Sequence, residues 1–152
     1  MRLCISRLVV AYSGSVASAA LLHLFSRVAA VVNRRSKTIE ILAVHVCTGS
    51  IRAPTPELAV EWKRNHSKLE DICRSYNLQC EIVEIEDAIE LSDTTSVDSS
   101  SLSPQEIQQR KISKLKELLA QGTSETYRED VVSSLIRALL VRTAKKHGCV
   151  KK

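Results

Sequence analysis

The chain has 152 residues, of which 44% are hydrophobic and 26% are charged, and its net charge is +5. This length supports one domain with one core and excludes two full domains, and the composition is typical of a globular protein. Only 3% of the residues are aromatic. The core must therefore be built mainly from aliphatic side chains, as in a parallel sheet covered by helices.

No apolar run approaches the roughly 20 residues of a membrane helix, so no membrane partner is expected. The start of the chain has the outline of a secretory leader, because Met1-Arg2 and an apolar stretch precede Ala17-Ser18-Ala19. Against that interpretation, Arg7 interrupts the stretch and the apolar residues continue beyond the supposed cleavage point.

Charge and cysteine content restrict the partners and the compartment. Residues 81–106 carry eight acidic and no basic side chains, whereas both flanking segments are basic. A basic body suits nucleic acid as a partner, and it equally suits a surface of solvated charge. The five cysteines form no C-x-x-C pair, which argues against a disulfide framework or a zinc site and favours a reducing compartment.

The first part of the chain alternates between strands and helices. Strands are predicted at residues 3–12, 38–47 and 79–85, which are β-branched, apolar or alternating runs. Helices are predicted at residues 16–33 and 56–77.

Beyond residue 85 the chain becomes acidic and then helical. Residues 86–103 are rich in Asp, Ser and Thr and predict a flexible acidic insertion. Two helices follow, preceded by the predicted capping boxes Ser103-Pro104-Gln105-Glu106 and Thr126-Tyr127-Arg128-Glu129, and Gly148 ends the second helix. The order β-α-β-α-β-α-α predicts a single α/β domain over residues 1–152, with an open parallel sheet and flanking helices.

The most informative stretch joins the first strand to the first helix. Residues 8–12 end the strand, Ser13-Gly14-Ser15 form a turn, and Ser18 lies in the first turn of the helix. A strand that enters a helix in this way leaves backbone N–H groups unpaired and pointing outward, which makes a natural anion cradle. Ser13, Gly14, Ser15 and Ser18 are therefore the candidate phosphate- or nucleotide-binding residues.

This turn resembles the PP-loop, S-G-G-x-D/S-S, of the adenine nucleotide alpha-hydrolase-like superfamily, which implies a HUP-like Rossmannoid fold. Catalytic members use the loop to hold phosphates while a carbonyl oxygen is adenylated and pyrophosphate leaves. Two positions depart from that pattern, because Ser15 replaces the second glycine and Ala17 stands where catalytic members carry an acidic residue. The resemblance implies a domain that is not catalytic by itself, with ATP as the candidate ligand.

A second resemblance lies near the other end of the chain. Ser124 to Asp130, followed by Leu139-Leu140 and by Ala144 to Cys149, is similar to the T-x-R-E-D-L-L … L-L … A … H-G-C helix of the cytoplasmic tRNA 2-thiolation protein, subunit 2. This implies a non-catalytic subunit that pairs with a catalytic sister in the cytoplasm. The heterodimer would 2-thiolate the wobble uridine of the tRNAs for Lys, Glu and Gln, using sulfur from a ubiquitin-like thiocarboxylate carrier.

Basic side chains in predicted loops and near the end of the chain are candidate contacts to tRNA phosphates: Arg34, Arg35, Lys37, Arg52, Lys145 and Lys146. The four histidines are not expected to converge. No metal ligand and no catalytic residue is predicted.

Compared with that family, the chain has no Cys-rich zinc segment ahead of the turn and ends at Lys152, where a further strand is expected. A truncated form, a partial domain without its last strands, is therefore expected. Its first strand would be an apolar sheet edge, which predicts self-association. Two alternatives stay open: a catalytic PP-loop ATP pyrophosphatase acting as a tRNA sulfurtransferase, and a small ATP-sensing domain of the universal-stress type.

Overall fold

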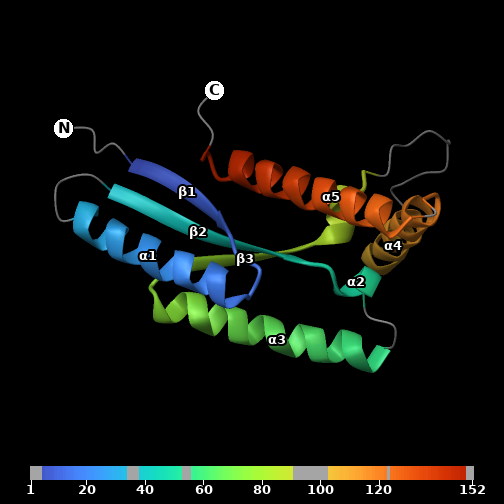
Figure 1. Ribbon diagram of the computed structural model, residues 1–152, viewed down its shortest axis with the longest axis horizontal. Coiled ribbons are helices and arrows are strands. Elements are labelled where there is room, and N and C mark those ends of the chain that lie inside the picture. The colour runs from blue at the N-terminus through green and yellow to red at the C-terminus, as the bar shows by residue number, and fades with distance from the viewer. Residues whose placement is uncertain (1–4, 34–37, 53–55, 91–102, 123, 150–152) are drawn as a thin grey trace.

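The computed structural model describes residues 5–33, 38–52, 56–90, 103–122 and 124–149 (Figure 1). β1 (Ile5–Ala11), β2 (Thr38–Cys47) and β3 (Gln79–Glu84) form a parallel sheet in the order β1-β2-β3. The predicted α/β fold with an open parallel sheet and flanking helices is confirmed, and so is the predicted order of these elements. Within the described residues β1 pairs with β2 alone, so it forms a border of the sheet.

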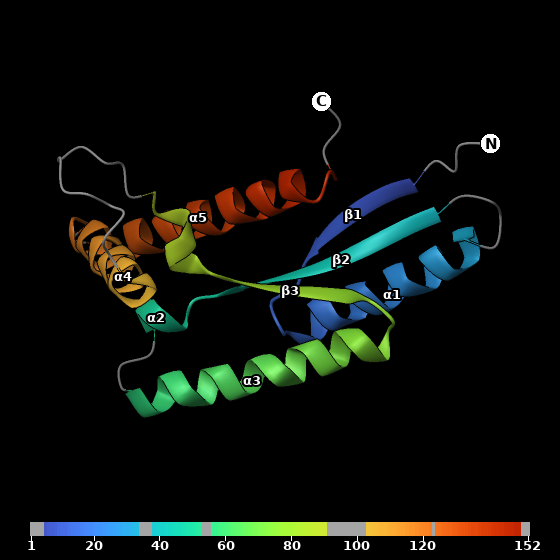
Figure 2. The same cartoon turned by 180° about the vertical axis from the view of Figure 1, so that it is seen from behind.

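Helices cover both faces of the sheet (Figures 1 and 2). α1 (Val16–Asn33) and α3 (Pro56–Ser75) lie against one face, and α5 (Glu125–Lys146) runs across the other. α4 (Pro104–Ala120) and the short helix α2 (Gly49–Arg52) lie together beyond the carboxyl end of β2. The sequence predicted a loop where α2 forms.

Two clusters of buried side chains hold these layers together. One lies between the sheet and the α1 and α3 layer, and its members are Val10, Tyr12, Leu22, Ala29, Ile41, Ala43 and Cys73. The other joins α4 and α5 to the region where β2 and β3 end, and its members are Ile85, Leu115, Val132 and Leu139. Burial of a side chain as large as Val, Leu or Ile contributes about 1.5–3 kcal/mol to stability. Apolar burial therefore holds both helix layers against the sheet.

The helix ends follow local chemistry, with one departure from the prediction. Ser103 Oγ accepts from the Glu106 N–H at 3.3 Å and Glu106 Oε2 accepts from the Ser103 N–H at 2.8 Å, so the first capping box is confirmed. The second predicted box is wrong, because Ser124 Oγ accepts from the Tyr127 N–H at 3.1 Å and caps α5. Thr126 consequently lies inside the first turn of the helix. Gly148 follows α5 with a φ of 68°, as a glycine at a helix C-terminus does.

The first residues of the interval expected to be a flexible acidic insertion are ordered instead. Ile85–Ala88 forms the 3-10 helix η1, in which Glu86 is only 3% exposed. The Glu86 carboxylate accepts hydrogen bonds from Ser50 Oγ at 2.7 Å and from Gln108 Nε2 at 2.9 Å, and so joins η1 to α2 and α4. Hydrogen bonds from distant segments are what permits such burial of a carboxylate. Residues 91–102 lie outside the described residues.

The expectation that no apolar run approaches the length of a membrane helix is wrong for α1. This helix has 18 residues and a mean hydropathy of 1.5, so its length and composition are sufficient to cross a membrane. Only Ser18, Leu22 and Ala29 are buried among its residues. Four others are between 48% and 58% exposed and follow one another at intervals of three and four residues: Leu21, Leu24, Val28 and Val31. We call this set the α1 apolar stripe, since such spacing places the four side chains on one helix face.

Candidate functional site

The predicted serine turn lies at the carboxyl end of β1, the edge at which open parallel sheets bind their ligands. Gly14 has a φ of 82°, a conformation that glycine adopts without steric cost. A Cβ at this position would also lie 3.2 Å from Leu69 Cδ2 of α3. The backbone angle therefore favours glycine here, and a larger residue would also displace the Leu69 side chain by a few tenths of an ångström.

The three serine hydroxyls of the turn lie against one another. Ser13 Oγ is 3.0 Å from Ser15 Oγ and 3.1 Å from Ser18 Oγ. The Ser18 N–H donates to Ser15 Oγ at 3.3 Å, so Ser15 caps α1, and Ser18 Oγ donates to the Ser15 carbonyl at 2.9 Å. Ser13, Gly14 and Ser15 are exposed, whereas Ser18 is 8% exposed. The structure thus brings the four predicted residues together, with Ser18 turned toward the backbone.

Free backbone donors remain at this turn. Among the described residues, the N–H groups of Gly14, Val16 and Ala17 have no hydrogen-bond acceptor. The first turn of α1 contains no acidic residue, so nothing on the helix itself opposes a negative charge at its positive end. This arrangement can accept an anion, and with an alanine at position 17 it offers no carboxylate for a catalytic metal or proton transfer.

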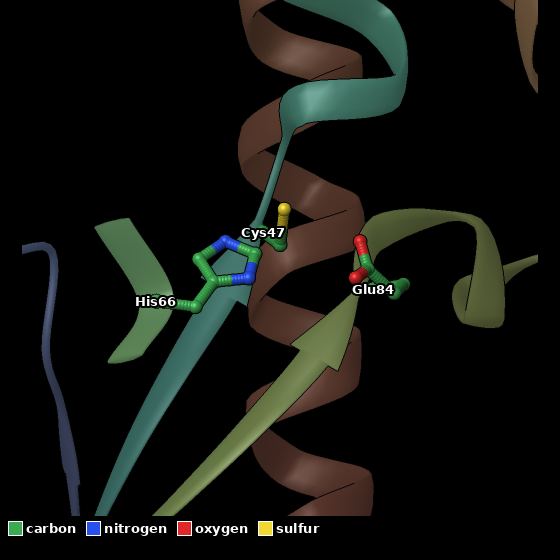
Figure 3. A group of neighbouring side chains, drawn as sticks. All are labelled: Cys47, His66 and Glu84. Carbon is green, nitrogen blue, oxygen red and sulfur yellow. The ribbon is translucent and has the colours of Figure 1, made fainter. Parts of the chain in front are cut away.

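A second group of polar side chains gathers where β2 and β3 end (Figure 3). Cys47 is the last residue of β2, Glu84 is the last residue of β3, and His66 approaches from α3. One possible ligand atom from each of the three lies within 4.8 Å of the other two. Cys47 is buried, and His66 and Glu84 are half-buried.

His45 connects this group to the serine turn. Its Nδ1 lies 2.8 Å from the carbonyl oxygen of Tyr12, the residue that precedes Ser13. Its ring also meets the His66 ring edge-to-face, with centroids 5.6 Å apart. The expectation that the histidines would not converge is therefore wrong for this pair. Because a carbonyl oxygen only accepts, Nδ1 carries the proton in the neutral ring and Nε2 holds the lone pair.

Burial governs the titration of these groups. It lowers the pKa of His45, against the opposing effect of the hydrogen bond to Tyr12, so the neutral ring is favoured. Burial also raises the pKa of Cys47 to about 11, with Glu84 adding to the rise and a hydrogen bond from the Gly49 N–H opposing it. Burial, together with neighbouring Cys73, raises the pKa of Cys80 to about 12. Both thiols are protonated at neutral pH, so neither has the character of a nucleophilic cysteine.

Only two of the basic residues predicted to contact RNA have described side chains, and neither of them lies at this edge. Lys145 and Lys146 lie at the end of α5, on the face of the sheet opposite to α1 and α3 (Figure 1). Arg34, Arg35 and Lys37 lie outside the described residues, as does the side chain of Arg52.

Lys146, at the basic C-terminal end of α5, and the following His147 make contacts within the fold. Lys146 Nζ donates to Glu81 Oε1 at 2.8 Å, and His147 Nε2 lies 2.5 Å from Glu81 Oε2. Partial burial raises the pKa of Glu81, but these hydrogen bonds outweigh it and leave that pKa below its ordinary value. Arg7 adds a hydrogen bond from Nη1 to the His147 carbonyl at 3.1 Å. These contacts of Lys146 and His147 thus hold the C-terminal end of α5 against β1 and β3.

Comparison with known proteins yields one structural resemblance. No family model matches the chain, and no curated protein matches it. Among solved structures, the U34-tRNA thiolase NcsA from Methanococcus maripaludis, with its 4Fe-4S cluster, aligns with a TM-score of 0.38 and 12% sequence identity. The alignment covers 78% of this chain and 35% of the thiolase chain. At these values the resemblance bears on neither activity nor individual residues.

Proposed function

We propose that this chain is a PP-loop-like domain that acts as the non-catalytic subunit in 2-thiolation of the tRNA wobble uridine. Its partners would be a catalytic sister subunit and tRNA in the cytoplasm, with a ubiquitin-like carrier supplying the sulfur. The tRNAs for Lys, Glu and Gln are the proposed substrates of the complex.

The observation that carries the proposal is the serine turn at the carboxyl edge of the sheet. It combines three free backbone N–H groups with the exposed hydroxyls of Ser13 and Ser15, which suits a phosphate group. Ala17 occupies the exposed position at which the resembling catalytic loops carry an acidic side chain. A phosphate cradle without that carboxylate favours a subunit that holds nucleotide or tRNA over one that performs the chemistry.

The α1 apolar stripe supports a protein partner. Four aliphatic side chains about half exposed on one helix face form a larger apolar surface than isolated exposed residues do. The stripe belongs to the same helix that begins at the serine turn, so a subunit docked there would lie next to the cradle.

The test is to deplete the protein from cells that express it and to measure 2-thiouridine in tRNA by mass spectrometry. We expect 2-thiouridine to fall and to return when the wild-type chain is re-expressed. A double variant, Ser13→Ala with Ser15→Ala, should fail to restore it. The matched control is Ser26→Ala on the same helix, because the Ser26 hydroxyl donates within α1 to the His23 carbonyl at 2.8 Å. That control should restore 2-thiouridine fully.

Other outcomes select other functions. Unchanged 2-thiouridine after depletion contradicts the proposal. Pyrophosphate release from ATP by the purified chain with tRNA would identify a catalytic ATP pyrophosphatase instead. ATP binding that is indifferent to tRNA, together with unchanged 2-thiouridine, would favour a nucleotide-sensing domain of the universal-stress type.

A further inference from the structure

The group formed by Cys47, His66 and Glu84 has the composition of a metal site. A thiol sulfur, an imidazole nitrogen and a carboxylate oxygen converge from β2, α3 and β3, all within 4.8 Å of one another (Figure 3). Three donors from three separate elements differ from a cluster of acidic side chains, because only packing brings them together. Zn²⁺ binds this set of donor types in proteins.

The spacing of the donors is close to what coordination requires. Ligand atoms at about 2.0–2.3 Å around a tetrahedral zinc ion lie roughly 3.3–3.8 Å from one another. The three donors therefore need to approach by about 1 Å or somewhat more, which rotation of the half-buried His66 and Glu84 side chains can supply. Cys47 is 4% exposed and is the last residue of β2.

We propose that Cys47, His66 and Glu84 bind one divalent metal ion of the zinc class at the carboxyl edge of the sheet. Three protein ligands leave a fourth coordination position for water or a ligand, as in catalytic rather than structural zinc sites. The site is independent of the thiolation function proposed above, and neither requires the other.

Groups next to Cys47 favour a bound cation and a thiolate ligand. The carboxylates of Glu84 and Glu86 act electrostatically on the Cys47 sulfur, and their negative charge attracts a cation. The Gly49 N–H donates to the Cys47 sulfur, a contact that stabilises a metal-bound thiolate. Because the thiolate is the ligand, metal uptake would release the Cys47 proton to solvent.

The position beside the serine turn gives the site a functional setting. His45 donates to the Tyr12 carbonyl at 2.8 Å and stacks edge-to-face on His66. His45 would therefore connect a metal ion on His66 with Tyr12, the residue that precedes the turn. His45 is a positioning residue in this arrangement, because it would act through His66 and Tyr12.

The experiment is a titration of the purified full chain with Co²⁺ and Zn²⁺. Cobalt bound to a thiolate gives a near-ultraviolet charge-transfer band, and displacement by Zn²⁺ abolishes it. Trp62 is the sole tryptophan of the chain, and its ring lies 3.3 Å from where a Cβ on Gly49 would stand. Its fluorescence should be quenched by Co²⁺ with the same midpoint, which reports binding next to Cys47.

Variants and matched controls locate the site. We expect Cys47→Ser to abolish the charge-transfer band, and His66→Asn and Glu84→Gln to weaken Co²⁺ and Zn²⁺ binding by at least about tenfold. The controls are Cys149→Ser and His23→Asn, because these side chains lie elsewhere in the fold. Both should bind as the wild type does. Circular dichroism identifies any variant that fails to fold, and His66→Asn and Glu84→Gln, both at half-buried positions, keep the test independent of the buried Cys47.

Two results would overturn the assignment. The first is a wild-type chain that gives no charge-transfer band and no saturable Zn²⁺ binding. The second is a band that persists in Cys47→Ser or disappears in Cys149→Ser, since the metal would then be bound elsewhere. In either case Cys47, His66 and Glu84 are neighbours through the packing of β2, α3 and β3 alone.

Discussion

Replacement of Gly14 by alanine tests the geometry of the serine turn directly. Gly14 has a φ of 82°, and a left-handed backbone costs a residue with a Cβ about 1–2 kcal/mol. The new Cβ would also lie 3.2 Å from Leu69 Cδ2. Moving Leu69 away from its preferred rotamer adds about 0.5–1.5 kcal/mol. We therefore expect Gly14→Ala to lower the free energy of unfolding by about 1.5–3.5 kcal/mol, the sum of these two costs.

The chain offers a control that separates the two contributions. Gly148 also has a positive φ, 68°, but a Cβ there would meet nothing within 4 Å. Gly148→Ala should therefore show the backbone cost alone, about 1–2 kcal/mol. Both variants can be compared with the wild type by urea denaturation at low protein concentration, with circular dichroism as the signal.

A double-mutant cycle completes the test. Leu69→Ala removes the atom that a Cβ on residue 14 would contact, so Gly14→Ala should cost less in that background, with a coupling energy of about 0.5 kcal/mol or more. The reasoning fails if Gly14→Ala costs no more than Gly148→Ala, or if the Leu69→Ala background leaves its cost unchanged. Either result would mean that α3 does not pack against the turn.

Three further predictions address pH dependence, capping and association. Burial lowers the pKa of His45, so the unfolded chain binds a proton at this residue more readily than the folded chain does. The free energy of unfolding should therefore decrease as pH falls from the ordinary histidine pKa through the lower pKa of folded His45. His45→Gln should remove this pH dependence, as measured by urea denaturation at a series of pH values. The pKa of Glu106 is lowered by hydrogen bonds from the Ser103 backbone and hydroxyl, so its stabilisation is present above the ordinary glutamate pKa and lost as pH falls through the folded value. Ser103→Ala should lower the free energy of unfolding by about 1 kcal/mol at neutral pH, and should flatten that acid dependence, as followed by circular dichroism. The purified chain should self-associate through the β1 edge and the α1 apolar stripe. Leu24→Glu should reduce the associated fraction measured by light scattering. A wild-type chain that is entirely monomeric would contradict this prediction.

Local chemistry made much of the fold predictable. α1 and β2 begin and end where the hydrophobic pattern placed them, because periodicity and flanking polar residues act over a few neighbouring positions. The Ser103 cap was predictable for the same reason. The cap of α5 was not, since Ser124 and Thr126 both offer a hydroxyl and only the path of the chain selected Ser124.

Side chains whose surroundings come from distant segments could not be predicted in this way. Glu86 lies in a stretch that reads as acidic loop, yet Ser50 and Gln108 bury its carboxylate. Cysteine spacing argued against a metal site, because such spacing reports only ligands that lie close together in the chain.

The sequence by itself determined the order of strands and helices, the glycine-containing turn after β1 and the absence of an acidic side chain at position 17. Each of these depends on neighbours along the chain. The tertiary structure alone decided that Cys47, His66 and Glu84 meet, and that His45 joins them to the turn. The physical reason is that parallel strands bring their carboxyl ends to one edge while α3 crosses back over them, so residues far apart in sequence become neighbours there.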